Sequence, residues 1–169
     1  MQLMPDSPLR RVALEVEAHV ATEGWDQAPR LFALVPTADL VAREPGLADQ
    51  LSADPDSITP IEQELSGDRE LEDLLTEIVW PDAVAGCAAV VERIMLPPEA
   101  EASLPDDPDE LLAAVAAHPD RREVRLVAAI TRDGRTHSTV RAREPIDAEL
   151  LEGPDLVPGL IEHLLRTLA

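Results

Sequence analysis

Two stretches of the chain carry apolar residues at the spacing of an amphipathic helix. In each stretch apolar side chains recur every three or four positions, so that they line one face of a helix. Ser7 and Pro8 open the first stretch with a capping side chain and a residue suited to the first turn, and Gly24 ends it. Asp155 is the expected cap of the second stretch. The two stripes are Leu9, Val12, Ala13, Val16 and Val20, and Leu160, Ile161, Leu164, Leu165 and Leu168.

Shorter runs between these stretches predict strands and further helices. Residues 31–35 form an apolar run too short for a helix, and residues 85–96 form the longest strand candidate. Residues 58–65 alternate in polarity but contain a proline, which allows only an edge strand. Thr37 as a cap and Pro45-Gly46 as a stop predict a short helix at 37–43. Apolar residues at helical spacing predict further helices at 71–79 and 111–115.

Residues 121–143 have the pattern of two strands joined by a tight loop around Asp133 and Gly134. A two-residue turn would mix apolar and charged side chains on one face of this hairpin. A three-residue loop, with Gly134 in a left-handed conformation, separates them. In that register Arg125 lies opposite Arg141 on the polar face. The other face holds Val124, Leu126, Ala128 and Ile130 with Thr136, Ser138, Val140 and Ala142.

The order of these elements predicts an α+β fold. Helices and strands do not alternate regularly, and the hairpin favours antiparallel pairing. No interdomain linker or internal repeat is visible, and 169 residues suit one domain. We therefore predict a single domain over residues 1–169, with a mainly antiparallel sheet of about five strands and helices packed on one face.

The charge balance narrows the classes of partner. The formal net charge is -20, every one of the 14 basic residues is arginine, and aromatic residues make up only 2% of the chain. An acidic surface repels nucleic acid and anionic membranes, and few aromatic rings are available to stack on bases. The absence of lysine excludes Schiff-base chemistry. We therefore expect neither a nucleic-acid partner nor a membrane partner.

The cysteine content and the first residues predict a compartment. Cys87 is the single cysteine, so it cannot form a disulfide within the chain, which fits a reducing environment. Residues 1–8 lack the pattern of a signal peptide, and no apolar run approaches the roughly 20 residues of a membrane span. These features predict a cytoplasmic protein.

The arginines of the hairpin are the main candidate for a site. The hairpin holds seven arginines and two acidic residues in a chain that is otherwise strongly acidic. Arg125 and Arg141, opposed across the strands, destabilise the sheet unless a negative group lies beside them. One explanation is a phosphate or carboxylate ligand held by Arg125, Arg141, Arg143 and His137.

The protein's own acids offer a second explanation for these arginines. The acidic stretch 97–120, or the strand segment at Glu92, could fold over the same face and neutralise it. Ion-pair networks within a protein perturb charges in the same way as a ligand site does. The sequence leaves both explanations open.

No other pattern predicts a catalytic or metal site. Cys87 is flanked by glycine and alanines that supply no base, so it is expected in the core. The four histidines lie apart without the spacing of metal ligands, and no phosphate-binding loop or dinucleotide fingerprint is present. We therefore expect no cofactor and no metal ion. Trp25 and Trp80 lie at the ends of elements, where a ring either lines a ligand cleft or anchors a loop on the core.

Three segments resemble a family of uncharacterised actinobacterial proteins. They are residues 24–35 (GWDQAPRLFALV), residues 80–88 (WPDAVAGCA) followed by Glu92 and Arg93, and residues 118–134 (HPDRREVRLVAAITRDG). The similarity extends over nearly the whole chain. The resemblance implies a high-GC bacterial cytoplasm, and it brings no activity, cofactor or catalytic residue to this sequence.

Three functional hypotheses follow. The first is a non-enzymatic binding protein whose arginine-bearing hairpin face meets an acidic partner segment or a small anion. The second is a small enzyme acting on an anionic metabolite, with Arg125 and Arg141 holding the substrate and His137 as acid or base. The third is an acidic decoy that occupies a basic protein surface through the arginine-free stretches 44–68 and 97–120. A homodimer, through an exposed hairpin edge or the C-terminal helix, is compatible with each hypothesis.

Overall fold

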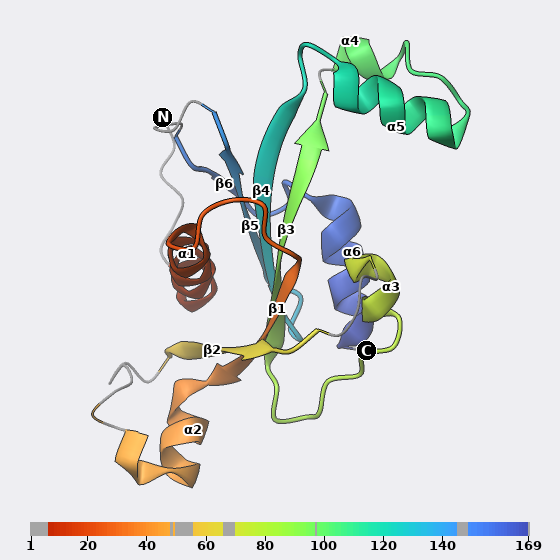
Figure 1. Cartoon of the computed structure of the whole chain (residues 1–169). Helices are drawn as coiled ribbons and strands as arrows, with labels where there is room; N and C mark the ends of the chain where they lie inside the picture. The colour runs from red at the N-terminus through yellow and green to blue at the C-terminus, as the bar shows by residue number, and fades with distance from the viewer. Residues whose placement is uncertain are drawn as a thin grey trace.

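The computed structural model describes residues 7–47, 49, 56–65, 70–96, 98–144 and 149–168. Its centre is a six-stranded sheet in the order β2-β1-β3-β4-β5-β6, in which every neighbouring pair is antiparallel (Figure 1). The strands are β1 (Arg30–Pro36), β2 (Ile58–Gln63), β3 (Gly86–Met95), β4 (Arg122–Thr131), β5 (Thr136–Ala142) and β6 (Leu151–Gly153). The predicted α+β class and antiparallel sheet are confirmed, and the sheet has one strand more than expected.

Helices cover both faces of the sheet, where the sequence led us to expect them on one (Figure 1). The helix α1 (Pro8–Ala21) lies on one face, and α3 (Leu71–Leu75) and α6 (Pro158–Thr167) lie on the other. The remaining helical segments are α2 (Thr37–Arg43), the 3-10 turn η1 (Pro45–Leu47), α4 (Pro98–Glu101) and α5 (Pro108–Ala117).

The burial of the central strands explains the two helical layers. Every residue of β4 from Val124 to Ile130 is buried, so both faces of the strand need a cover. Under α1 lie Phe32, Leu34, Ala88, Val90, Val127 and Ala129, packed on the predicted stripe of that helix. The cluster on the opposite face includes Cys87, Leu126, Ala128 and Ile130 with Trp80, Leu160, Ile161 and Leu164.

The helix α1 follows its sequence signals. The Ser7 hydroxyl oxygen accepts a hydrogen bond from the backbone N–H of Arg10 at 3.0 Å, and Pro8 occupies the first turn. All five apolar residues of the predicted stripe are buried. Glu17 is buried with them, although it is acidic.

The register predicted for the hairpin is confirmed. Arg125 pairs with Arg141, and the other pairs follow the same alignment. The backbone N–H of Thr131 donates to the carbonyl of Arg135 at 3.0 Å, which closes a three-residue loop. Gly134 has a φ of 87°, in the left-handed region that a residue with a side chain avoids.

The C-terminal region differs from the sequence expectation in two respects. Residues 151–153 form β6, an additional strand that pairs with β5. Val157, rather than Asp155, occupies the N-cap of α6, and no side chain caps this end. The helix begins with Pro158, which has no N–H that needs a hydrogen-bond partner. The absence of a capping side chain therefore destabilises this end of the helix less.

Two predicted helices bury less of their apolar surface than their sequences suggest. The helix α3 ends at Leu75, and Val79 beyond it is 80% exposed. The helix α5 forms as predicted, with the Asp107 side chain accepting from the N–H of Glu110, yet none of its residues is buried. Leu112 of this helix is 71% exposed. Figure 1 shows α5 beyond the far ends of β3 and β4, away from the helices that cover the core.

Candidate functional site

Arg125 lies inside the protein, on the face of β4 that α1 covers. Its side chain is 1% exposed, and its guanidinium carbon lies 4.4 Å from the centre of the Trp25 ring. Its Nη2 donates to the carbonyl of Gly24 and lies 3.7 Å from Oε2 of Glu92 on β3. Burial lowers the pKa of Arg125, and the charge of Glu92 opposes this effect. Arg125 is therefore paired inside the protein and closed to a ligand from solvent.

Glu92 also holds the loop that covers Arg125. Its two carboxylate oxygens accept the backbone N–H groups of Asp26 and Gln27 at 2.9 and 3.1 Å. Within the described part of the chain, Asp26 is the one residue other than glycine with a positive φ, at 67°. This tight loop carries Trp25 over the guanidinium group. Trp25 therefore anchors a loop on the sheet.

Arg141 pairs with Glu17 of α1. Its Nε and Nη2 donate to Oε1 and Oε2 of the carboxylate at 2.5 and 3.1 Å. This bidentate contact raises the pKa of Arg141. The negative charge that the opposed Arg125 and Arg141 require is thus supplied by Glu17 and Glu92.

Arg143 lies just beyond β5 and contacts two acids. Its Nη1 donates to Asp26 at 2.8 Å and to Glu123 at 2.9 Å, and its Nη2 donates to the other oxygen of Asp26 at 3.1 Å. Hydrogen bonding to Arg143 lowers the pKa of Asp26. These three groups are more open to water than the Arg141 pair, so their contacts stabilise the fold less.

His137 belongs to a second contact between α1 and the sheet. It is buried, and its Nε2 lies 3.0 Å from Oε1 of Glu152 on β6. Arg10 of α1 donates from Nε and Nη2 to the same carboxylate at 2.8 and 3.1 Å. The contact with Arg10 holds the pKa of Glu152 below its usual value.

The structure brings the four predicted site residues onto one face of the hairpin and places each beside a carboxylate of the protein. These residues are Arg125, Arg141, Arg143 and His137. Glu92 was one of the acids expected to neutralise this face, whereas α4 and α5, from the other expected segment, lie away from it (Figure 1). Glu17 was not expected. Glu17 could have been predicted from its position, because it lies at helical spacing between Ala13 and Val20 of the apolar stripe.

Cys87 and Trp80 belong to the core. The indole N–H of Trp80 donates to the hydroxyl of Thr167 at 2.9 Å. Burial raises the pKa of Cys87 to about 11, so its thiol is protonated at neutral pH.

Among the described residues, no group of three or more His, Cys, Asp and Glu side chains could hold a metal ion. In the same part of the chain, no helix has the length and apolar character to cross a membrane.

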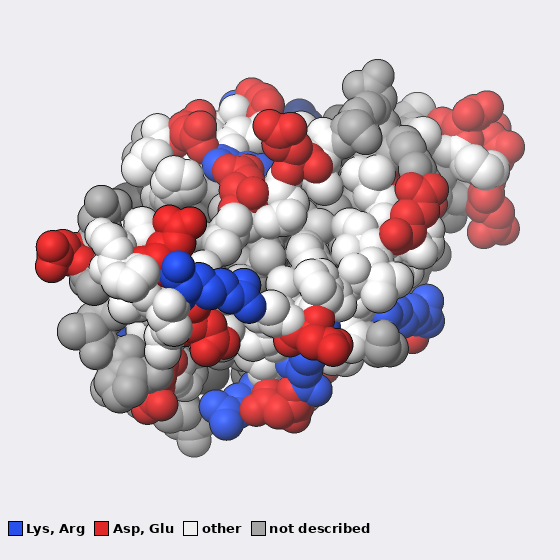
Figure 2. All heavy atoms as spheres, turned by 90° about the horizontal axis from the view of Figure 1, so that it is seen from below, with Lys and Arg blue, Asp and Glu red and all other residues white. Residues whose placement is uncertain are grey.

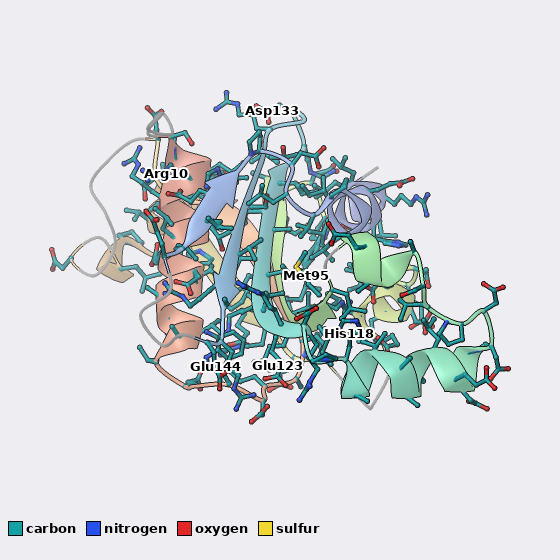
Figure 3. All side chains as sticks on the ribbon, turned by 90° about the horizontal axis from the view of Figure 1, so that it is seen from above. Arg10, Met95, His118, Glu123, Asp133 and Glu144 are labelled. Atoms are coloured by element: carbon teal, nitrogen blue, oxygen red, sulfur yellow. The ribbon has the colours of Figure 1, made fainter. Side chains whose placement is uncertain are left out.

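One open cavity lies at the end of the hairpin opposite the Asp133–Gly134 loop, and we name it the arginine end. It has a volume of about 590 Å³. Its lining residues are Pro119, Arg121, Arg122, Glu123, Arg143 and Glu144. Arg121 and Arg122 are exposed, and Arg121 donates to the carbonyl of His118 at 3.0 Å. Figure 3 shows Glu123 and Glu144 at this end of the sheet, with His118 nearby.

A second open cavity, the outer groove, lies on the face of the sheet that α1 does not cover. It has a volume of about 590 Å³. Its lining residues are Met95, Leu96, Asp120, Arg122, Val124, Val140, Ala142, Glu149, Leu151 and Leu156. Met95, Leu151 and Leu156 are 48%, 59% and 40% exposed. Figure 3 shows Met95 between the sheet and the helices α5 and α6. The apolar face of the sheet therefore continues beyond the part that the core helices cover.

Acidic side chains are prominent on the lower face of the molecule and along the segment that contains α4 and α5. Seen from below, Asp and Glu side chains are spread around a largely uncharged central area (Figure 2). The described residues 98–120 carry acids and no arginine, and α4 and α5 lie within this segment. Residues 48, 50–55 and 66–68 of the other arginine-free stretch lie outside the described residues.

These features define a class of protein: a single α+β domain with an internally neutralised arginine face and an open apolar groove. The family model described as PPA1309-like protein matches residues 9–169, and the chain belongs to this uncharacterised family. The match confirms the predicted resemblance to an uncharacterised family over nearly the whole chain. Neither a curated protein nor a solved structure matches the chain.

Proposed function

We propose that this protein is a non-enzymatic interaction module that binds an amphipathic helix of a partner protein in the outer groove. The observation that carries the proposal is the groove itself, in which Met95, Leu151 and Leu156 remain exposed around a cavity of about 590 Å³. Removing apolar surface from water is favourable by about 25 cal/mol per Å². Exposed apolar patches with polar rims mark interaction sites on soluble proteins.

The edge of the sheet beside the groove favours a helix over an added strand. The strand β6 is three residues long and is followed directly by Pro154. A partner strand added there would form few backbone hydrogen bonds. A helix needs no such bonds, because it inserts side chains at i, i+3 or i+4 and i+7 into a groove.

The pairing of the arginine face supports binding over catalysis. Arg125 and His137 are buried, and Arg141 is held by Glu17. A substrate at this face would have to displace the protein's own carboxylates. A cytoplasmic setting is part of the proposal, and the free thiol of Cys87 supports it.

A neutral model peptide tests the proposal, because electrostatic attraction then does not contribute to binding. We expect a peptide of about 18 residues, with leucine along one helical face and glutamine elsewhere, to bind the wild-type protein in isothermal titration calorimetry. Leu151→Glu places a charge in the groove, and we expect it to weaken binding about tenfold or more, because a carboxylate is costly to bury.

Two controls separate groove binding from unspecific association. Val79→Glu makes the same change at a residue that is 80% exposed and outside the groove, and it should leave the affinity unchanged. A peptide of the same composition in scrambled order should not bind. Equal loss in both variants, or no binding to the wild type, would contradict the proposed function.

The arginine end supports a second candidate function, the binding of a small anion or an acidic partner segment. Arg121, Arg122 and Arg143 line this cavity together with two glutamates. Arg121 and Arg122 are exposed, and guanidinium groups hold phosphate and carboxylate in bidentate fashion.

A thermal-shift measurement tests the second candidate. Inorganic phosphate or citrate at a hundred times the dissociation constant would stabilise the native state by about 2.7 kcal/mol and raise Tm. We expect Arg121→Ala with Arg122→Ala to abolish that rise and Arg135→Ala, on the hairpin loop, to preserve it. A rise that persists in the double variant would remove the arginine end as the site.

A further inference from the structure

We infer that the helix bound in the outer groove is basic, with an apolar face flanked by arginine or lysine. This inference rests on the proposed function and adds the chemistry of the partner. It is carried by the juxtaposition of the apolar groove with acidic side chains on the segment that continues from β3 through α4 and α5 to β4.

The charges next to the groove are predominantly negative. Of the described residues that line it, Asp120 and Glu149 are acidic and Arg122 is basic. Glu99, Asp106, Asp107, Asp109 and Glu110 are exposed on the adjoining segment. No arginine or lysine occurs between residues 98 and 120, and Arg121 and Arg122 are the first basic residues after this segment.

The position of α5 places these acids beside the path of a bound helix. Figure 3 shows α5 on the α6 side of the sheet, extending outward from His118, with Met95 between it and the strands. The acids Asp109 and Glu110 are in its first turn, at the end away from His118. A helix that binds over Met95 and runs along α5 would therefore contact apolar side chains of the groove at one end and acidic side chains of α5 at the other.

The helix α5 also exposes apolar surface, although none of its residues is among those that line the outer groove. None of its residues is buried, although its sequence is mainly leucine, alanine and valine. Leu112 of this helix is 71% exposed. A partner helix between α5 and the sheet would cover apolar surface on both sides.

The net charge disfavours a second copy of this chain as the occupant of the groove. Each copy carries a formal charge of -20, and like charges brought together in an interface oppose association. The same charge attracts a basic segment from a distance and increases the rate of encounter. Charge complementarity therefore selects a basic partner over a second copy.

Three peptides with one leucine face and different polar residues test the inference. Their polar positions carry glutamine, arginine or glutamate. We expect the arginine peptide to bind at least about tenfold more tightly than the glutamate peptide at about 20 mM salt, and the difference to shrink at about 500 mM salt, because salt screens exposed charges. Leu151→Glu should weaken the binding of the arginine peptide as it does that of the neutral peptide.

A matched pair of charge variants locates the effect. Glu99→Gln, Asp109→Asn and Glu110→Gln together remove three exposed charges from the segment that contains α4 and α5, whereas Asp39→Asn, Glu44→Gln and Asp82→Asn remove three exposed charges elsewhere. We expect the first triple variant to reduce the preference for the arginine peptide several-fold and the second to change it little. Asp107 is left in place because its side chain caps α5.

The outcomes distinguish the inference from the proposed function. If the neutral peptide binds but the arginine peptide is no tighter than the glutamate peptide, the basic partner is wrong and the groove stands as a docking site. If none of the three binds, the proposed function fails. Binding of the arginine peptide that Leu151→Glu leaves unchanged would indicate attraction to the acidic surface alone and would contradict both. A concentration-dependent dimer in light scattering that Leu151→Glu abolishes would make a second copy the occupant.

Discussion

Arg141→Ala is expected to lower the free energy of unfolding by about 3 kcal/mol. The substitution leaves the carboxylate of Glu17 buried against the sheet without its bidentate partner. Loss of one member of a buried ion pair costs about 3–5 kcal/mol. We expect the lower end of that range because the Arg141 side chain is itself 30% exposed. Urea unfolding followed by circular dichroism measures the change.

Two further variants test the reason for this loss. Arg135→Ala removes a hairpin arginine whose side chain is 67% exposed and should change stability by less than about 0.5 kcal/mol. Replacing both partners, Glu17→Met with Arg141→Met, should recover much of the loss, since no charge is then left unpaired. If Arg141→Ala unfolds at the wild-type midpoint, the ion pair with Glu17 does not stabilise the fold.

Gly86→Ala is expected to destabilise the protein by about 3 kcal/mol or more, or to prevent folding. A methyl group at this position would lie 2.1 Å from the carbonyl oxygen of Ile130 on the neighbouring strand. Both groups belong to the backbone of the paired strands β3 and β4, so neither can turn away. The glycine therefore permits the close approach of the two central strands.

The matched control for this substitution is Gly46→Ala. An added methyl group there meets no atom within 4 Å, and the backbone does not require glycine, so stability should stay within about 0.5 kcal/mol of the wild type. Thermal unfolding of both variants measures the contrast. Equal melting temperatures for Gly86→Ala and the wild type would show that β3 and β4 are further apart than described.

Local patterns predicted much of this fold. The polarity of residues 121–143 was sufficient to choose the three-residue loop, because one register mixes charged and apolar faces and the other does not. Ser7 and Pro8 located the start of α1 for a similarly local reason, since capping depends on a few neighbouring backbone groups.

The partners of the arginines depend on packing between distant segments, which a single sequence does not encode locally. Glu17 reaches Arg141 across 124 positions of the chain. The strand β6 is only three residues long and forms by pairing with β5, so no alternation marked it. The outer groove could not be predicted either, because its lining residues come together from segments that are far apart in the sequence.

The arginine face and the outer groove differ in how far the protein itself covers and pairs their side chains. The arginine face joins α1 to the sheet through Glu17 and Glu152 and joins the loop after α1 to the sheet through Glu92, and these contacts hold the fold together. The outer groove has apolar residues that no described part of the chain covers, and we propose that it serves the interaction with a partner. Under this proposal, stability and binding depend on different faces of one sheet.

The most direct test of this division is the titration of the isotopically labelled protein with the neutral leucine-glutamine peptide, followed by backbone amide NMR. We predict chemical-shift changes at Met95, Val124, Val140 and Leu151 and along α5, with the amides of Trp25, Arg125 and Arg141 unchanged. Changes centred on the arginine face, or no changes at peptide concentrations that saturate the calorimetric signal, would contradict the outer groove as the binding site.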